Sequence, residues 1–234
     1  HQVVRRQRQM CIRDSTSSTV GTPACAYHFY GGAADASNVA YPQPSTLTSP
    51  LAGFDFGAGD IHLGTRADRD GSRHFQGKIA LVNVYDYVVT NTQAMCLFRG
   101  GDAALPDPTA IYSASGCAPL ELDISFIGDT TDRSGNDHAV VLHGSATVDT
   151  DGVHFGGQGD FAQIADFDYY SDGTFTISFW MTKEACTGTI YEYLYSHALD
   201  ANVDITVTTN SNVNMYIGCE AAGGGWSSAS DGTV

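Results

Sequence analysis

The feature that most constrains the fold is a set of short segments in which apolar and polar residues alternate. The clearest are LELDISF at 120–126, TFTISFW at 174–180, VDITV at 203–207 and VNMYI at 213–217. Successive side chains of a β-strand point to opposite faces, so a period of two predicts strands. Turn residues such as TNSN at 209–212 separate these segments. Short strands at regular spacing favour an all-β fold built as an antiparallel two-sheet sandwich.

Composition supports the same fold class and excludes some partners. The chain has 234 residues, 42% of them hydrophobic, which is enough for a core, and its 26 glycines suit strands joined by tight turns. The formal net charge of −15 would repel phosphate backbones and anionic membrane surfaces, so nucleic acid is not an expected partner. No run reaches the roughly 18 apolar residues of a membrane span, so we expect no membrane insertion in this fragment.

The first fifteen residues differ in composition from the rest. HQVVRRQRQMCIRDS holds four of the eleven basic residues and has no apolar core of a secretory signal. RQRQMCIRDS resembles translated sequencing-adapter read-through, so residues 1–15 are interpreted as a non-native or disordered segment and left out of the fold prediction.

Two parts of the chain resemble pieces of one kind of domain. The order DTTDRSGN, GVHFGGQGDFAQIAD and GTFTISFWM within 118–181 resembles the opening of a laminin G-like, concanavalin A-like domain. DIHLGTRAD and GKIALVNVYDYVVTNTQAMCLF, within 60–98, resemble the closing third of such a domain. The resemblance implies a jelly-roll sandwich. It predicts a C-terminal part of one domain at 16–101, a linker at 102–117 and an N-terminal part of a second domain at 118–234, within a fragment of a longer tandem array.

The two partial units are complementary, because one supplies final strands and the other supplies initial and middle strands. In jelly rolls of this superfamily the first and last strands are usually neighbours. A permuted assembly of the two parts would bury edges that separate halves would expose. The sequence leaves open whether one sandwich or two are formed.

A loop rich in acids is the candidate metal site. DTTDRSGND, at 129–137, places oxygen-bearing side chains in one turn, where they could surround Ca²⁺; these are Asp129, Asp132, Asn136 and Asp137. The alternative is that Asp and Asn serve only as turn residues there. Relatives of the laminin G-like and pentraxin-like kind often use calcium, but their ligands come from several loops.

The cysteines lack the spacing of a zinc site and are interpreted as disulfide partners. Cys186 and Cys219 follow two predicted strands and are expected to pair, and Cys96 with Cys117 is expected to close the linker. Buried reduced cysteines in a cytosolic protein are the alternative. Disulfides favour an extracellular or cell-surface location.

Other candidate residues are fewer. Trp226, in a glycine-rich stretch, could stack on a sugar ring, although a packing role or a place in a disordered end is the favoured alternative. In GGQGDFAQI, at 156–164, the glycines are expected to turn the chain between two strands, with Asp160 starting the second. ELDISF, at 121–126, lacks the second glutamate of the E-x-D-x-E motif found in glycoside hydrolases on this type of sandwich, so no catalytic pair is predicted.

These patterns predict a non-catalytic extracellular recognition or adhesion module that binds glycans or protein partners, with Ca²⁺ as the one suggested cofactor. The alternative is an accessory or degenerate domain of a secreted carbohydrate-active enzyme. A structural spacer in an adhesin-like array is a third interpretation.

Overall fold

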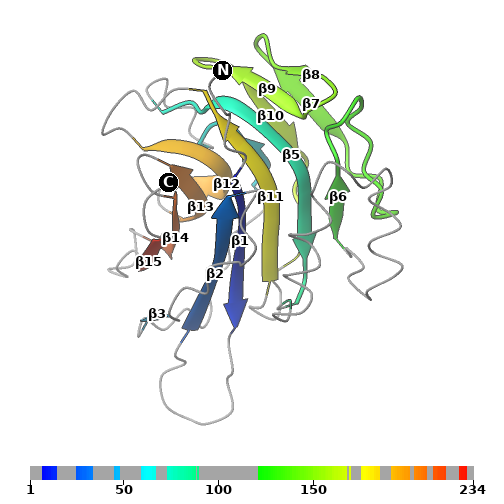
Figure 1. The fold of residues 1–234 in the computed structure, drawn as a ribbon. Helices are drawn as coiled ribbons and strands as arrows, with labels where there is room; N and C mark the ends of the chain where they lie inside the picture. Colours follow the sequence, from blue (N-terminus) through cyan, green and yellow to red (C-terminus); the bar gives the residue numbers. More distant parts are fainter. Residues whose placement is uncertain are drawn as a thin grey trace.

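The computed structural model describes the backbone of residues 7–14, 25–33, 45–47, 59–66, 73–87, 89, 121–167, 169, 175–184, 191–200, 203–209, 213–219 and 227–230, and the side chains of 59–66, 73–87, 89, 121–167, 169, 175–184, 191–197 and 206–209. Within these ranges there is no helix, and fifteen strands form two sheets in which all strand pairs are antiparallel (Figure 1). The predicted all-β class is confirmed.

The first sheet has eight strands. Along its main path the order is β3 (Ser45–Leu47), β2 (Cys25–Ala33), β1 (Gln7–Asp14), β11 (Phe175–Lys183), β5 (Gln76–Tyr85), β9 (Val153–Gly156) and β8 (Thr147–Val148), with β6 (Leu122–Ile124) paired to β5. The second sheet has seven strands in the order β15 (Ser227–Ser230), β14 (Val213–Cys219), β13 (Val203–Thr209), β12 (Glu192–Asp200), β4 (Ile61–Leu63), β10 (Phe161–Ile164) and β7 (Val140–His143).

The two partial units share both sheets. In the second sheet, β4 lies between β10 and β12. In the first, β5 lies between β11 and β9. β4 and β5, from the 16–101 unit, are therefore each flanked on both sides by strands of the 118–234 unit, which is the permuted pairing that the sequence left open. Whether the division at 102–117 separates two natural domains stays a prediction, and that stretch lies outside the described residues.

Side chains from both sheets meet in one apolar core. It includes Phe155, Phe175, Ile177 and Phe179 from the first sheet, and Ile61, Leu63, Ile164 and Leu194 from the second, each at most 1% exposed. Their alternation along each strand explains why the sequence pattern predicted a sandwich. Trp180 points to the face opposite Phe179 and is still only 8% exposed, as expected for a strand covered on both sides.

The alternation at 120–126 does not separate a buried face from an exposed one. Asp123 is 5% exposed and Ser125 1% exposed, although both occupy polar positions of the pattern. Asn83 on β5 donates from Nδ2 to Asp123 Oδ1 at 2.9 Å. Burial raises the pKa of Asp123, against the opposing effects of the Asn83 hydrogen bond and Arg133. The polar face of β6 is therefore a second buried layer and not a solvent face.

Residues 7–14, within the segment set aside in the sequence analysis, have strand backbone. This strand, β1, pairs with β11 on one side and β2 on the other. The resemblance to adapter read-through concerns the origin of these residues, which their backbone pairing does not test.

The turn at 157–160 carries the chain from the first sheet to the second, from β9 to β10. Asp160 Oδ1 accepts hydrogen bonds from Ser145 N at 2.6 Å and Ser145 Oγ at 3.1 Å, and its Oδ2 accepts from Gly156 N at 2.8 Å. One carboxylate thus ties two loops together. The sequence predicted an architectural role for Asp160 between two strands, and Asp160 lies directly before the first residue of β10.

A glycine allows the two layers to approach at the end of β4. Gly64 has φ of +88°, and a Cβ added there would lie 3.1 Å from the ring of Phe155 in the other sheet. Gly128 has a similar φ of +81° but open space around it. The two positions therefore carry similar backbone strain and differ in packing.

We expect Gly64→Ala to lower the free energy of unfolding by about 1–2 kcal/mol more than Gly128→Ala, because only the first forces the Phe155 ring to shift. Urea unfolding of both variants measures the difference. Equal losses in the two variants would show that strain alone, and not contact between the layers, determines the cost.

Candidate functional site

Asp132, from the predicted metal loop, is buried and surrounded by hydrogen-bond donors. It is 8% exposed. Its Oδ1 accepts from the backbone N–H groups of Asp123 at 3.1 Å and Ser134 at 2.9 Å. Its Oδ2 accepts from Ser134 Oγ at 2.8 Å and from His138 N at 3.0 Å. Both oxygens are thus engaged by the protein's own donors, which fold the loop around this carboxylate.

The pKa of Asp132 reflects these contacts. Burial is the largest influence and acts to raise the pKa, but the hydrogen bonds from Ser134, His138 and Asp123 together lower it below its ordinary value of 3.8. The carboxylate is therefore held ionised by donors within the loop.

The other three predicted ligands lie on the exposed side of the same loop. Asp129 accepts from Thr131 N at 3.0 Å and lies 3.7 Å from Arg133. Asn136 donates to the carbonyl of Glu121 at 3.1 Å, and Asp137 has φ of +57°. Among the side chains that the structure describes, no three His, Cys, Asp or Glu residues converge as metal ligands would. The calcium assignment stays a prediction.

The side chains of the remaining predicted site residues lie outside the described part of the chain. Trp226, Cys96, Cys117 and Cys186 lie outside the described residues, and only the backbone of Cys219, at the end of β14, is described. The sugar-stacking role and both disulfides stay predictions.

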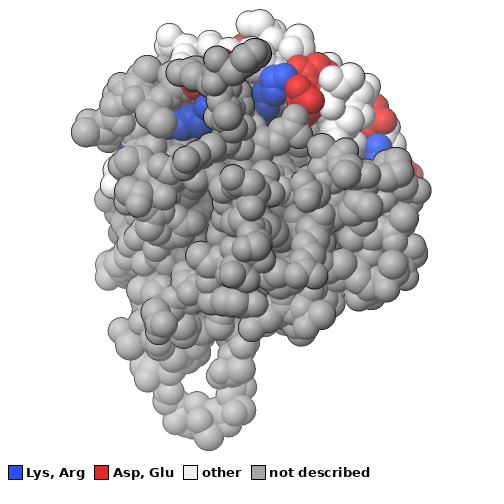
Figure 2. All heavy atoms as spheres, in the orientation of Figure 1, with Lys and Arg blue, Asp and Glu red and all other residues white. Residues whose placement is uncertain are grey.

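Basic side chains gather at one end of the sandwich. Five Lys or Arg side chains are described, and four of them lie where β4 and β11 end and where β5 and β12 begin; they are Arg66, Arg73, Lys78 and Lys183. Arg133 is the fifth and belongs to the loop after β6. Figure 2 shows basic and acidic side chains next to one another along the top of the molecule. Four described acids lie at the same end, Asp149, Asp151, Glu184 and Glu192, so basic and acidic groups are balanced there.

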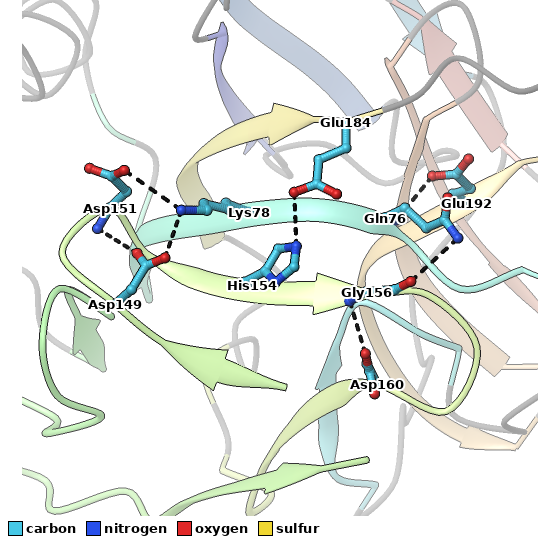
Figure 3. A network of polar contacts seen from close by, with 9 residues as sticks. All are labelled: Gln76, Lys78, Asp149, Asp151, His154, Gly156, Asp160, Glu184 and Glu192. Atoms are coloured by element: carbon cyan, nitrogen blue, oxygen red, sulfur yellow. Dashed lines mark hydrogen bonds and ion pairs between the residues drawn. The ribbon is translucent and has the colours of Figure 1, made fainter. Parts of the chain in front are cut away.

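Some of these basic groups are paired with acids (Figure 3). Lys78 Nζ lies 2.6 Å from Asp149 and 3.6 Å from Asp151. The hydrogen bond to Asp149 raises the pKa of Lys78 and, reciprocally, lowers that of Asp149. On the neighbouring strand the ring of His154 lies 2.8 Å from Glu184. These pairs are largely exposed, so they orient side chains more than they stabilise the fold.

Two arginines converge on one tyrosine at this end. The guanidinium of Arg66 lies over the Tyr193 ring, 5.7 Å from its centroid. Arg73 donates from NH1 to the Tyr193 hydroxyl at 3.3 Å. Both arginines are half-buried, while Tyr193 is 7% exposed. We call Arg66, Arg73 and Tyr193 the arginine–tyrosine cluster.

A buried ion pair between Lys183 and Glu192 lies next to the cluster. Lys183, the last residue of β11, lies 3.2 Å from Glu192, the first residue of β12, and their side chains are only 5% and 12% exposed. Glu192 also accepts from the backbone N–H of Gln76 at 3.4 Å. The backbone of Tyr193 donates to the carbonyl of Arg73 at 3.1 Å. These contacts link strands of both sheets next to Tyr193.

Sequence reasoning missed this cluster because its members come from separated segments. Arg66 follows β4 and Arg73 precedes β5, whereas Tyr193, the second residue of β12, comes more than a hundred residues later. The available signal was weak: of the seven basic residues beyond position 15, four lie between 66 and 78. No sequence pattern indicated that Tyr193 would lie between two of them.

Comparisons with known proteins identify no relative: no family model, no curated protein and no solved structure matches the chain. In the described part of the chain, no helix has the length and apolar character needed to cross a membrane. The resemblance to laminin G-like domains therefore stays a hypothesis drawn from the sequence.

Proposed function

We propose that this chain is a non-catalytic extracellular recognition module of the laminin G-like, concanavalin A-like kind, which binds a glycan or a protein ligand at one rim of the sandwich. The observation that carries the proposal is the arginine–tyrosine cluster, where two half-buried guanidinium groups bracket one aromatic side chain. It lies at the end of the molecule where most of the described basic residues gather.

The chemistry of the cluster suits polar ligands with negative or electron-rich groups. Arginine offers several N–H donors in a planar arrangement that matches carboxylate and sulfate oxygens. A rigid scaffold keeps the loss of side-chain freedom on binding small. The Lys183–Glu192 pair and the backbone bond between Tyr193 and Arg73 provide such a scaffold.

Calcium is the second element of the proposal. Of its four candidate ligands, Asp129, Asn136 and Asp137 lie on the exposed side of their loop, and Asp132 is buried. Such ligands would be completed by groups from the binding partner or by water.

A glycan array probed with the full 234-residue chain, with and without EDTA, tests the proposal. We expect binding to acidic glycans, and we expect Arg66→Gln with Arg73→Gln to weaken it about 10- to 100-fold, the loss that follows from removing hydrogen bonds to a charged group. Lys78→Gln is the control, because Lys78 lies at the same end of the sandwich but pairs with Asp149 and Asp151 and not with Tyr193. EDTA should weaken binding only if calcium takes part.

Failure to bind any glycan or any extracellular protein in either condition would refute the recognition role. Equal binding by the double variant and the control would refute the assignment to this cluster.

A further inference from the structure

A histidine is buried between the two sheets and is hydrogen-bonded through both ring nitrogens. His197, on β12, is fully buried. Its Nδ1 lies 3.0 Å from the hydroxyl of Tyr169, and its Nε2 lies 3.0 Å from Asp166 Oδ1. The Tyr169 hydroxyl lies 2.8 Å from that of Tyr195. Asp166 and Tyr169 follow β10. His197 therefore ties the start of the β10–β11 connection to β12.

The order of donors follows from the chemistry of the groups. An ionised Asp166 only accepts, so Nε2 carries the proton and donates to it, and Nδ1 accepts from Tyr169. Tyr169 in turn accepts from Tyr195. A neutral His197 therefore completes a chain that runs from Tyr195 to the carboxylate. Adding a proton at Nδ1 turns this acceptor into a donor, and the bond from Tyr169 must reverse or break.

The surroundings oppose that proton. Burial is the main influence and lowers the pKa of His197 below its ordinary value of 6.5, against the opposing effects of Asp166, the Gly59 backbone and Asp60. Among the described residues, the titratable groups that face the ring are Asp166 and Tyr169 from the connection, Tyr195 from β12 and Asp60 from the residues before β4. Asp166 is 29% exposed, which gives protons a route from solvent.

We propose that His197 is an acid-sensitive latch, whose protonation reverses or breaks its bond with Tyr169 and so frees Tyr169 and Phe167 from the second sheet. The consequence extends to the loop of the predicted calcium ligands. Phe167 packs on Tyr169 with ring centroids 5.4 Å apart, and it stacks on His138 at 4.1 Å. His138 N in turn donates to Asp132. Release of Phe167 therefore removes a support of the 129–138 loop.

The sign of the effect follows from linkage. Because the pKa of His197 is lower in the folded state, the neutral ring stabilises the fold above pH 6.5. This stabilisation is lost as the pH falls from 6.5 through the folded-state pKa. Over that interval the opening equilibrium constant rises by up to about tenfold per pH unit.

Hydrogen exchange of the full chain between pH 7.5 and 5.0, corrected for intrinsic exchange, tests the latch. We expect amides of β10 and β12 to lose protection by up to about tenfold per pH unit below 6.5, while those of β5 and β11 lose less. In His197→Gln the β10 and β12 amides should be less protected already at pH 7.5, with a flatter pH dependence. His154→Gln is the matched control, because His154 also contacts a carboxylate but lies away from this connection; it should behave as the wild type.

Titration of the His197 ring by NMR in the wild-type protein keeps the proposal testable if His197→Gln does not fold. Protonation of the ring in step with the loss of protection supports the latch. A ring that becomes protonated while β10 and β12 keep their protection, or unchanged protection from pH 7.5 to 5.0, overturns it.

Discussion

Asp132→Asn should lower the free energy of unfolding by about 3 kcal/mol, one of the two largest losses that we expect. The carboxylate is 8% exposed and accepts four hydrogen bonds, two at each oxygen. An amide keeps one oxygen and places N–H donors where the other oxygen accepted from Ser134 and His138. Two donors are then left without an acceptor in a buried place, and the amide brings donors of its own.

The same contacts predict how acid affects this loop. Because the pKa of Asp132 is lower in the folded state than its ordinary value of 3.8, its stabilisation is present above that value. It is lost as the pH falls through the folded-state pKa. Asp132→Asn removes this titration, so the variant should lose less stability than the wild type between pH 5 and acidic conditions near pH 2.

Asp137→Asn is the control for both measurements. Asp137 lies in the same loop but is exposed, and asparagine tolerates its φ of +57° as well as aspartate does. Chemical unfolding should show a change within about 0.5 kcal/mol. A loss for Asp132→Asn as small as that of the control would mean that the carboxylate does not organise the loop. If the carboxylate instead binds Ca²⁺, addition of Ca²⁺ should raise the unfolding temperature of the wild type and not that of Asp132→Asn.

Lys183→Met should destabilise the protein by a similar amount, about 3 kcal/mol. Removing the lysine leaves the carboxylate of Glu192 buried without its partner 3.2 Å away. An unpaired buried charge costs more than the pair contributes, since the ion pair itself is offset by the desolvation of both groups. The loss of free energy is measured by urea unfolding at pH 7.

The double variant Lys183→Met with Glu192→Gln separates these contributions. Glutamine removes the buried charge and keeps an oxygen to accept from Gln76 N. We expect the double variant to recover most of the stability lost by the single one. Additive losses would show that the two side chains do not interact. The pair would then not be part of the scaffold that we assign to the arginine–tyrosine cluster.

The strands themselves were predictable because their side chains alternate locally. Phe175, Ile177 and Phe179 alternate with polar residues, and all three are buried in the core. The hairpin of β13 and β14 was equally predictable, since its two strands flank the TNSN turn. Each of these features depends on neighbours in sequence, which the pattern of residues records directly.

Other features depend on contacts that local pattern does not record. Asp123 looked like a residue of a polar strand face, but the structure buries it against Asn83. Asp132 looked like one of four equivalent cation ligands, yet it differs from its neighbours because donors from Asp123 and His138 reach it. His197 was one of eight scattered histidines, although the alternation that places Tyr195 in the core also places His197 there.

The sequence by itself determined the fold class of this protein, the position of several strands of the 118–234 unit and the turn between two strands that ends at Asp160. Periodicity and turn chemistry are local properties, so a single sequence carries them. The tertiary structure decided that β4 and β5 lie between strands of the other part, and that Arg66, Arg73 and Tyr193 meet at one rim. Those contacts join residues about a hundred positions apart, and they arise only when hydrophobic burial brings both sheets together.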